Sequence, residues 1–116
     1  IGGGWTGHEA LAIAVYSAVK HSSSFENAIV SSVNHSGDSD STGAICGNIM
    51  GALLGRNAIP EYYTKDLELL DIIEEMAEDL FTGCIISEYM ERDTPETRRW
   101  FDKYCLFKWT PKCSNN

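Results

Sequence analysis

Two aspartates one residue apart, followed by two hydroxyl side chains and a glycine, form the most distinctive local pattern in this chain. In the stretch NHSGDSDSTGAICG they are Asp38 and Asp40, then Ser41 and Thr42, then Gly43. Carboxylate and hydroxyl oxygens are the ligands that hard cations prefer. Paired carboxylates also serve as a nucleophile with its acid–base partner. Three kinds of site use such a pattern, and each requires a different fold around it.

A calcium-binding EF-hand loop would place Asp38, Asp40 and Thr42 at its first, third and fifth positions, with Gly43 at the turn. Its twelfth position would then be Ile49, where a glutamate normally binds the ion through both oxygens. The pattern disfavours an EF-hand because the strongest ligand is missing.

A phosphatase loop of the D-x-D-x-T type would use Asp38 as nucleophile and Asp40 as acid–base group. Such a loop follows a buried parallel strand. The preceding residues, AIVSSVNHSG, are polar at Ser31, Ser32 and Asn34 and follow a helical period instead. This alternative is therefore the weaker one.

A hard-cation site at the start of a helix is the third interpretation. Asp38 and Asp40 would turn toward one ion, and Ser41 or Thr42 would add a hydroxyl to an oxygen shell suited to Mg²⁺. A purely structural interpretation explains the same residues, with Asp40 capping a helix and Asp38 forming an Asx turn. Spacing by itself leaves both open.

Helical periodicity predicts the elements that must position this loop. Thr6 and Ser23 each begin a capping box with a glutamate three residues later, and Pro95 follows a threonine as the first residue of a helix. The helices are expected over 6–20, about 24–34, about 41–55, about 61–80 and about 95–107. No long alternation with period two occurs, so we expect an all-α fold of about five helices.

The third expected helix carries four glycines at four-residue spacing, Gly43, Gly47, Gly51 and Gly55. Glycine costs about 1 kcal/mol relative to alanine inside a helix. The stripe therefore predicts close approach of another backbone. Gly55 is expected to end the helix in the left-handed conformation.

Charge and cysteine content limit the possible partners and compartment. The chain has 17 acidic and 9 basic residues and a net charge of −8, which argues against nucleic acid and anionic membranes as partners. No apolar run is long enough to span a bilayer. Cys46 and Cys84 lie in apolar helical contexts, so we expect reduced, buried thiols in a cytoplasmic protein. Cys105 and Cys113 are left open as paired or free.

Several motifs in order resemble the ADP-ribosylglycohydrolase family, which includes the glycohydrolase that reactivates dinitrogenase reductase. They are GGGWTGHEALAIAVYSAV, FENAIVSSVNHSGDSDSTGAICGNIMGALLG, AIPEYY and MAEDL. The G-D-x-D-[ST] loop with its GA-x-x-G tail is the specific part. The resemblance implies that residues 1–116 are one domain fragment, the C-terminal portion of that all-α fold. Residues 1–80 would be its core, and 81–116 a helical extension.

The resemblance also implies a function and a set of site residues. The family binds two Mg²⁺ ions, sometimes Mn²⁺, in a cleft where water cleaves ADP-ribose from a protein side chain, with arginine as the default. The implied metal ligands are Asp38, Asp40 and Ser41, and the implied substrate contacts are Gly3, Gly4, Trp5 and His35. Two of these have structural alternatives: Trp5 as a staple against the first helix, and His35 as a capping or packing residue.

This chain departs from the family where other metal ligands are expected. Family members carry a Thr-Asp-Asp run and an upstream glutamate in an N-terminal half, and this sequence has neither. The chain opens on IGGGWTGHEAL without an initiator methionine. We therefore expect an incomplete hydrolase, inactive alone, whose partners are ADP-ribose or an ADP-ribosylated protein and an N-terminal half of the same fold. The alternative is a non-catalytic relative that binds ADP-ribose or has a structural role.

Overall fold

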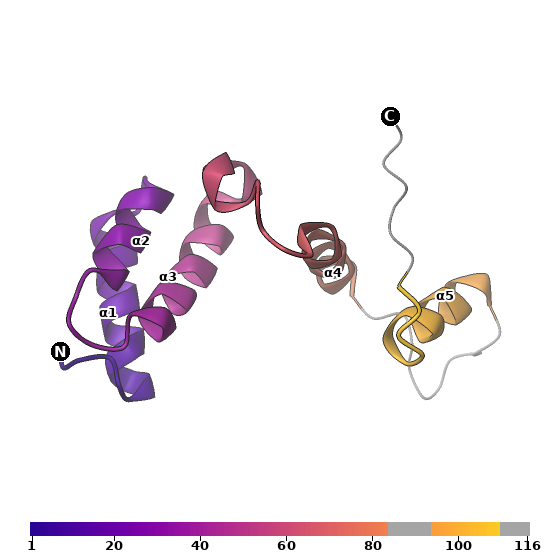
Figure 1. Ribbon diagram of the computed structural model, residues 1–116, viewed down its shortest axis with the longest axis horizontal. Coiled ribbons are helices and arrows are strands. Elements are labelled where there is room, and N and C mark those ends of the chain that lie inside the picture. Colours follow the sequence, from indigo (N-terminus) through magenta and orange to yellow (C-terminus); the bar gives the residue numbers. More distant parts are fainter. Residues whose placement is uncertain (84–93, 110–116) are drawn as a thin grey trace. The chain divides into compact units, whose positions relative to one another are not determined.

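The computed structural model describes residues 1–83 and 94–109, and every regular element among them is helical (Figure 1). The helices are α1 (Gly7–Lys20), α2 (Phe25–Val33), α3 (Ser39–Leu54), α4 (Leu70–Thr82) and α5 (Pro95–Tyr104), with 3₁₀ turns η1 (Arg56–Ala58) and η2 (Glu61–Tyr63) after α3. This confirms the expected all-α fold of five helices.

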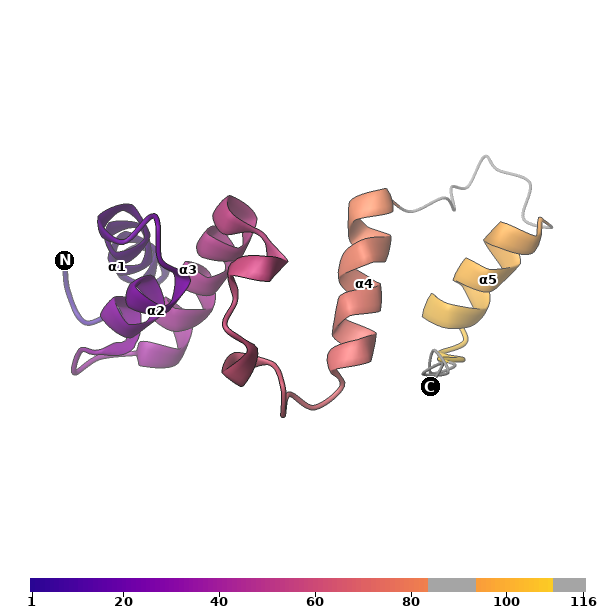
Figure 2. The ribbon, with the colours of Figure 1, turned by 90° about the horizontal axis from the view of Figure 1, so that it is seen from above.

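The chain forms two compact units, which we call the N-terminal unit (Ile1–Asp66) and the C-terminal unit (Leu67–Asn116). In the N-terminal unit, α1, α2 and α3 all pack on one another (Figure 2). The C-terminal unit contains α4 and α5. The sequence analysis divided the chain at residue 80 into a family-like core and a helical extension. That division rests on family resemblance and not on packing, so it stays a prediction.

Small side chains form the core of the N-terminal unit. The buried apolar residues are Ala10, Ala14 and Ala18 of α1, Phe25 and Ala28 of α2, and Cys46 and Met50 of α3. The three alanines of α1 are four residues apart and therefore lie on one face of that helix. Because alanine adds only a methyl group, the neighbouring helix can approach closely. Cys46 is buried, as expected, whereas Cys84 and Cys113 lie outside the described residues.

The glycine stripe of α3 is needed at fewer positions than the spacing predicted. A Cβ on Gly43 would lie 2.7 Å from Val33 Cγ1 of α2, whereas one on Gly47 would make an ordinary contact and one on Gly51 would meet open space. Gly55 has the expected positive φ of 79°, but its ψ of 169° is extended rather than left-handed helical. Only Gly43 is required by a close helix contact.

Several helix boundaries differ from the expected ones. Ser24, not Ser23, caps α2, because the N–H of Asn27 donates to Ser24 Oγ at 3.3 Å. Helix α3 begins at Ser39, two residues early, because Asp38 rather than Asp40 is its N-cap. The 3₁₀ turn η2 occupies the expected start of α4.

Buried charges connect the two helices of the C-terminal unit. Lys103 of α5 is 7% exposed, and its ammonium donates to Glu75 at 2.5 Å and also to Asp79, both on α4. Tyr104 donates its hydroxyl proton to the same Asp79 at 2.6 Å. Burial alone would lower the pKa of Lys103, but the hydrogen bonds to the two carboxylates outweigh it and raise that pKa.

Substitution of two glycines of α3 by alanine tests the close contact. Gly43→Ala and Gly51→Ala each gain about 1 kcal/mol of helix propensity. Gly43→Ala also forces Val33 to move, and such overpacking costs about 1–3 kcal/mol. We expect Gly43→Ala to be less stable than Gly51→Ala by that cost in urea unfolding. Adding Val33→Ala should remove most of the difference, whereas equal stability of the two single variants would contradict the contact.

The charge cluster predicts an acid transition confined to the C-terminal unit. Hydrogen bonds from Lys103 and then Tyr104 hold the pKa of Asp79 below its usual value. The stabilisation is present above the unfolded pKa, about 3.9, and is lost as the pH falls through the lowered native value. The tryptophan fluorescence of the chain should therefore change as the pH falls below about 3.9 and through the lowered native pKa of Asp79. Asp79→Asn should abolish that change, whereas the exposed Asp66→Asn should retain it.

Candidate functional site

The N-terminal glycine segment and the aspartate loop lie directly against each other. The backbone N–H of Asp38 donates to the carbonyl of Gly3 at 2.9 Å. A Cβ on Gly37 would lie 1.7 Å from that carbonyl oxygen. Gly4 is buried, with φ +81°, and its missing Cβ would lie 3.1 Å from Thr42 Cγ2. The structure therefore brings two predicted substrate residues, Gly3 and Gly4, beside a predicted metal ligand.

A buried hydroxyl holds the aspartate loop in place. Thr42 is fully buried, and its Oγ1 lies 2.7 Å from the carbonyl oxygen of Ser32, to which it donates. His35 Nε2 lies 3.0 Å from the same Oγ1. The N–H of Gly37 donates to His35 Nδ1 at 3.0 Å. Because Nδ1 accepts that bond, the neutral ring carries its proton on Nε2 and donates it to Thr42.

Asp38 and Asp40 both face the backbone N–H of Ser41. That N–H lies 2.8 Å from Asp40 Oδ1 and 3.5 Å from Asp38 Oδ1. Hydrogen bonding to the Asp40 side chain, followed by hydrogen bonding to Ser41, holds the pKa of Asp38 below its usual value. Asp38 is half-buried, whereas Asp40 is exposed. The loop therefore presents an anionic carboxylate at neutral pH beside a second carboxyl group.

The observed helices exclude two of the three interpretations of the pattern. Residues 39–54 form α3, so no twelve-residue calcium loop exists there, and Thr42 is buried rather than open to an ion. The residues before Asp38 form α2 and a short turn, not the strand that a D-x-D-x-T phosphatase requires. The structural interpretation was right that an aspartate of this pattern caps the helix but wrong about which one, because the N-cap of α3 is Asp38 and not Asp40.

The other two predicted substrate residues are in contrasting environments. Trp5 is 76% exposed, so it is not a staple against α1, and its indole Cδ1 lies close to Gly3. His35 is half-buried and uses both ring nitrogens within the loop, as the structural alternative expects. A contact of either residue with substrate stays a prediction.

Sequence reasoning missed two residues on which the site depends. Gly37 provides the close contact with Gly3, and Ser39 donates its hydroxyl proton to the carbonyl of Val33 at 2.8 Å, which ties the end of α2 to the start of α3. The only available signal was their position on either side of Asp38.

The described residues contain neither a cluster of metal-binding side chains nor a membrane-spanning helix. Across 1–83 and 94–109, no three His, Cys, Asp or Glu side chains are grouped so that they could hold a metal ion. No helix in the same part of the chain is long and apolar enough to cross a membrane.

Comparison with known proteins gives one family. The family model described as ADP-ribosylglycohydrolase matches residues 1–88. ADP-ribosylhydrolase ARH1 of Dictyostelium discoideum is 40% identical over 78 residues, which are 67% of this chain and 20% of that protein. An uncharacterized protein of Archaeoglobus fulgidus is 42% identical over 57 residues, which are 49% of this chain and 18% of that protein. The chain spans about a fifth of the length of these curated relatives. No solved structure was found to match it.

Substitution of Gly37 tests the contact between the two segments. In Gly37→Ala the new methyl group would meet the Gly3 carbonyl, so the hydrogen bond from the Asp38 N–H should break. We expect hydrogen exchange at the Asp38 amide to accelerate at least tenfold, which corresponds to about 1.4 kcal/mol of lost protection. Gly7→Ala is the matched control, because a Cβ there meets nothing within 4 Å. Unchanged exchange in Gly37→Ala would contradict the packing described.

Proposed function

Because the chain belongs to the ADP-ribosylglycohydrolase family, we propose that it forms part of an enzyme that hydrolyses the bond between ADP-ribose and a protein side chain. The observation that carries this proposal is the hydrogen bond between Asp38 and Gly3. It joins the candidate metal loop to the candidate substrate segment in one unit of the fold. The expected modified side chain is that of arginine.

We propose Asp38, Asp40 and Ser41 as ligands of Mg²⁺ or Mn²⁺. The donor set fits a hard cation, because it consists of two carboxylates and a hydroxyl and the lowered pKa of Asp38 keeps it ionised. These groups would leave other positions to water or to ligands from outside this chain, as in a binuclear site completed elsewhere. When bound, such an ion polarises an oxygen of the substrate and stabilises negative charge that develops there.

The chain's own residues would shape the substrate side of the cleft. The exposed indole of Trp5 offers a flat apolar surface on which a ribose or an adenine can pack. Gly3 carries no side chain and is half-buried, so its backbone stays partly accessible beside the aspartates, whereas Gly4 is buried. His35 would hold the loop that carries Asp38 and would reach substrate only if one of its ring hydrogen bonds were exchanged.

A further part of the same fold would complete this site. Helix α1 exposes an apolar stripe of Leu11, Val15 and Val19, which are 50%, 42% and 72% exposed. Apolar patches of this kind commonly mark a surface that another protein segment covers. Since the chain spans about a fifth of its relatives, we propose that an N-terminal half packs on this stripe and supplies the remaining metal ligands.

Paramagnetic NMR with Mn²⁺ tests the metal ligands directly. We expect low Mn²⁺ concentrations to broaden the amide signals of residues 38–41 and of Gly3 and Gly4, and EDTA to restore them. Asp40→Asn should weaken the effect about tenfold or more, because a charged ligand is lost. Asp66→Asn removes an exposed carboxylate elsewhere in the same unit and should change nothing. Broadening centred on the acidic residues of α4 would contradict the assignment.

The same residue tests catalysis in the protein completed by its N-terminal half. Asp40→Ala should lower hydrolysis of ADP-ribosyl-arginine by about two orders of magnitude or more, since charge stabilisation of this kind contributes several kcal/mol. Turnover near the wild-type rate would contradict the proposed role. Magnesium-dependent binding of ADP-ribose without turnover in the complete wild-type protein would favour the non-catalytic relative.

A further inference from the structure

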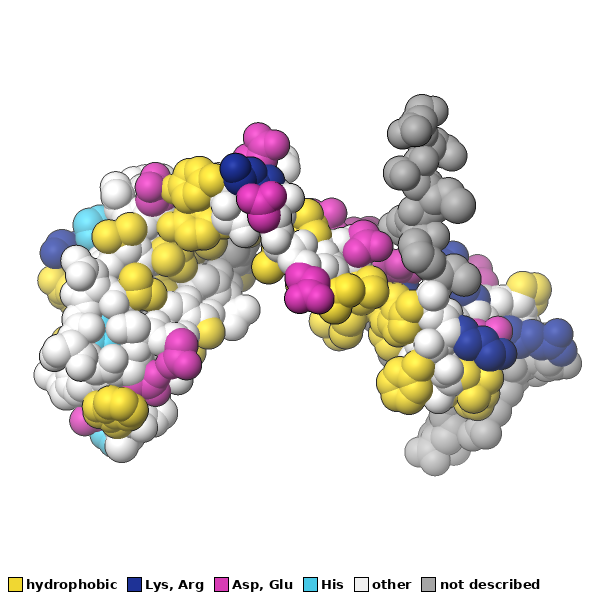
Figure 3. Space-filling model, in the orientation of Figure 1, with side chains coloured by type: hydrophobic (Ala, Val, Ile, Leu, Met, Phe, Trp, Pro, Cys, Tyr) yellow, Lys and Arg dark blue, Asp and Glu magenta, His cyan; other side chains and the backbone are white. Residues whose placement is uncertain are grey.

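Basic side chains are concentrated in the C-terminal unit of an otherwise acidic chain. Figure 3 shows Lys and Arg side chains gathered over α5. Four of the chain's 9 basic residues line a single cavity of about 600 Å³. Among the described residues, the wall consists of Glu75, Pro95, Arg98, Arg99, Asp102, Lys103, Lys108 and Trp109. Cavities of 300–1,000 Å³ are typical of small-molecule sites.

Cations outnumber carboxylates among the described wall residues. These residues include four cations and two carboxylates, whereas the whole chain has a net charge of −8. Lys103 is committed to Glu75 and Asp79. Its charge therefore holds α4 and α5 together and is not the one available to a ligand.

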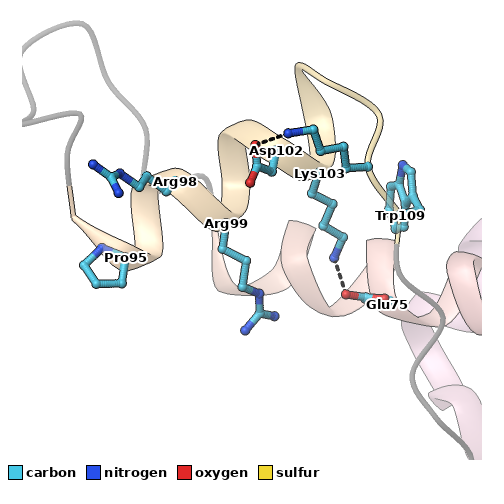
Figure 4. A pocket seen from close by; sticks show the side chains of 8 residues that line it. Glu75, Pro95, Arg98, Arg99, Asp102, Lys103 and Trp109 are labelled. Atoms are coloured by element: carbon cyan, nitrogen blue, oxygen red, sulfur yellow. Dashed lines mark hydrogen bonds and ion pairs between the residues drawn. The ribbon is translucent and has the colours of Figure 1, made fainter.

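Two other cations are available to an incoming anion. Arg99 is exposed, and its charge acts on Asp79 only at longer range, where it helps to lower the pKa of that carboxyl group. Arg99 lies four residues before Lys103, and Figure 4 shows both side chains leaving α5 on the same side. Lys108 contacts Asp102 at 3.3 Å, and both side chains are at least half exposed. Such a surface ion pair contributes little, so a stronger anion can replace Asp102 at small cost.

Trp109 and Pro95 provide the apolar part of the wall, against which the body of a ligand can pack. Trp109 packs edge-on against Tyr104 at 5.5 Å between ring centroids, and the ammonium of Lys103 lies 4.7 Å from the Trp109 centroid. Pro95 is on the same wall. The cavity is larger than a bare phosphate needs, so it has space for the organic part of a phosphorylated molecule.

We propose that this cavity binds a phosphate-bearing small molecule, with Arg99 and Lys108 contacting the phosphate oxygens. Guanidinium groups form paired hydrogen bonds with phosphate, and a lysine adds a point charge. Seven of the eight described wall residues lie beyond residue 88, where the family match ends. The site therefore uses other residues than the aspartate loop, and the proposal does not depend on the proposed hydrolase function.

The test is an NMR titration of the chain with ADP and with pyrophosphate, both in EDTA. We expect saturable shifts of the Trp109 indole signal, assigned with Trp109→Phe, at ligand concentrations up to about 1 mM. Arg99→Gln and Lys108→Gln should each weaken binding about tenfold, as expected for loss of one charge-assisted contact. Arg56→Gln, in η1 of the N-terminal unit, is the matched control and should leave the affinity unchanged.

Each outcome decides the proposal. Tighter binding of ADP supports a nucleotide ligand, and tighter binding of pyrophosphate supports the free anion. An absence of saturation with both probes, or equal affinity in wild type, Arg99→Gln and Lys108→Gln, would overturn the site. Shifts at residues 38–41 that require Mg²⁺ would instead report on the proposed metal centre, so the two proposals can fail independently.

Discussion

The hydrogen bond from the Asp38 N–H to the Gly3 carbonyl is the constraint around which the candidate site is arranged. It requires two backbones to approach more closely than any side chain would allow, because a Cβ on Gly37 would overlap the Gly3 carbonyl. The glycines on both sides of this contact therefore have a steric role. Through it, the segment that carries Trp5 is fixed relative to the aspartates of the loop.

The loop itself depends on the hydrogen bonds of a buried threonine and a half-buried histidine. Thr42 accepts from His35 and donates to Ser32, and His35 accepts from Gly37. Leaving the buried Thr42 hydroxyl without its partner costs about 1–3 kcal/mol. Burial of Thr42 also explains why it cannot be a metal ligand, and this leaves Ser41 as the hydroxyl next to the two carboxylates.

The two units are stabilised by different kinds of interaction. The N-terminal unit packs helices through alanines and one essential glycine, while the apolar stripe of α1 stays exposed. The C-terminal unit instead joins α4 to α5 through Lys103 and two carboxylates. A buried ion pair is strongly destabilising when one partner is removed, although it adds little over a well-packed apolar contact. The lysine that joins these two helices also lies on the wall of the cavity beside α5.

The sequence by itself determined the helices and the family, because both depend on local signals. The Thr6 capping box, Pro95 as the first residue of α5 and the G-D-x-D-[ST] motif are all contained within a few residues. It could not distinguish Ser23 from Ser24 as a cap, or Asp38 from Asp40, since adjacent residues of one type offer the same chemistry. Tertiary structure alone decided that Gly37 meets Gly3, that Thr42 is buried, and that Arg99 and Lys108 share a cavity. These contacts join residues distant in sequence or depend on how helices pack, and no local pattern encodes such distances.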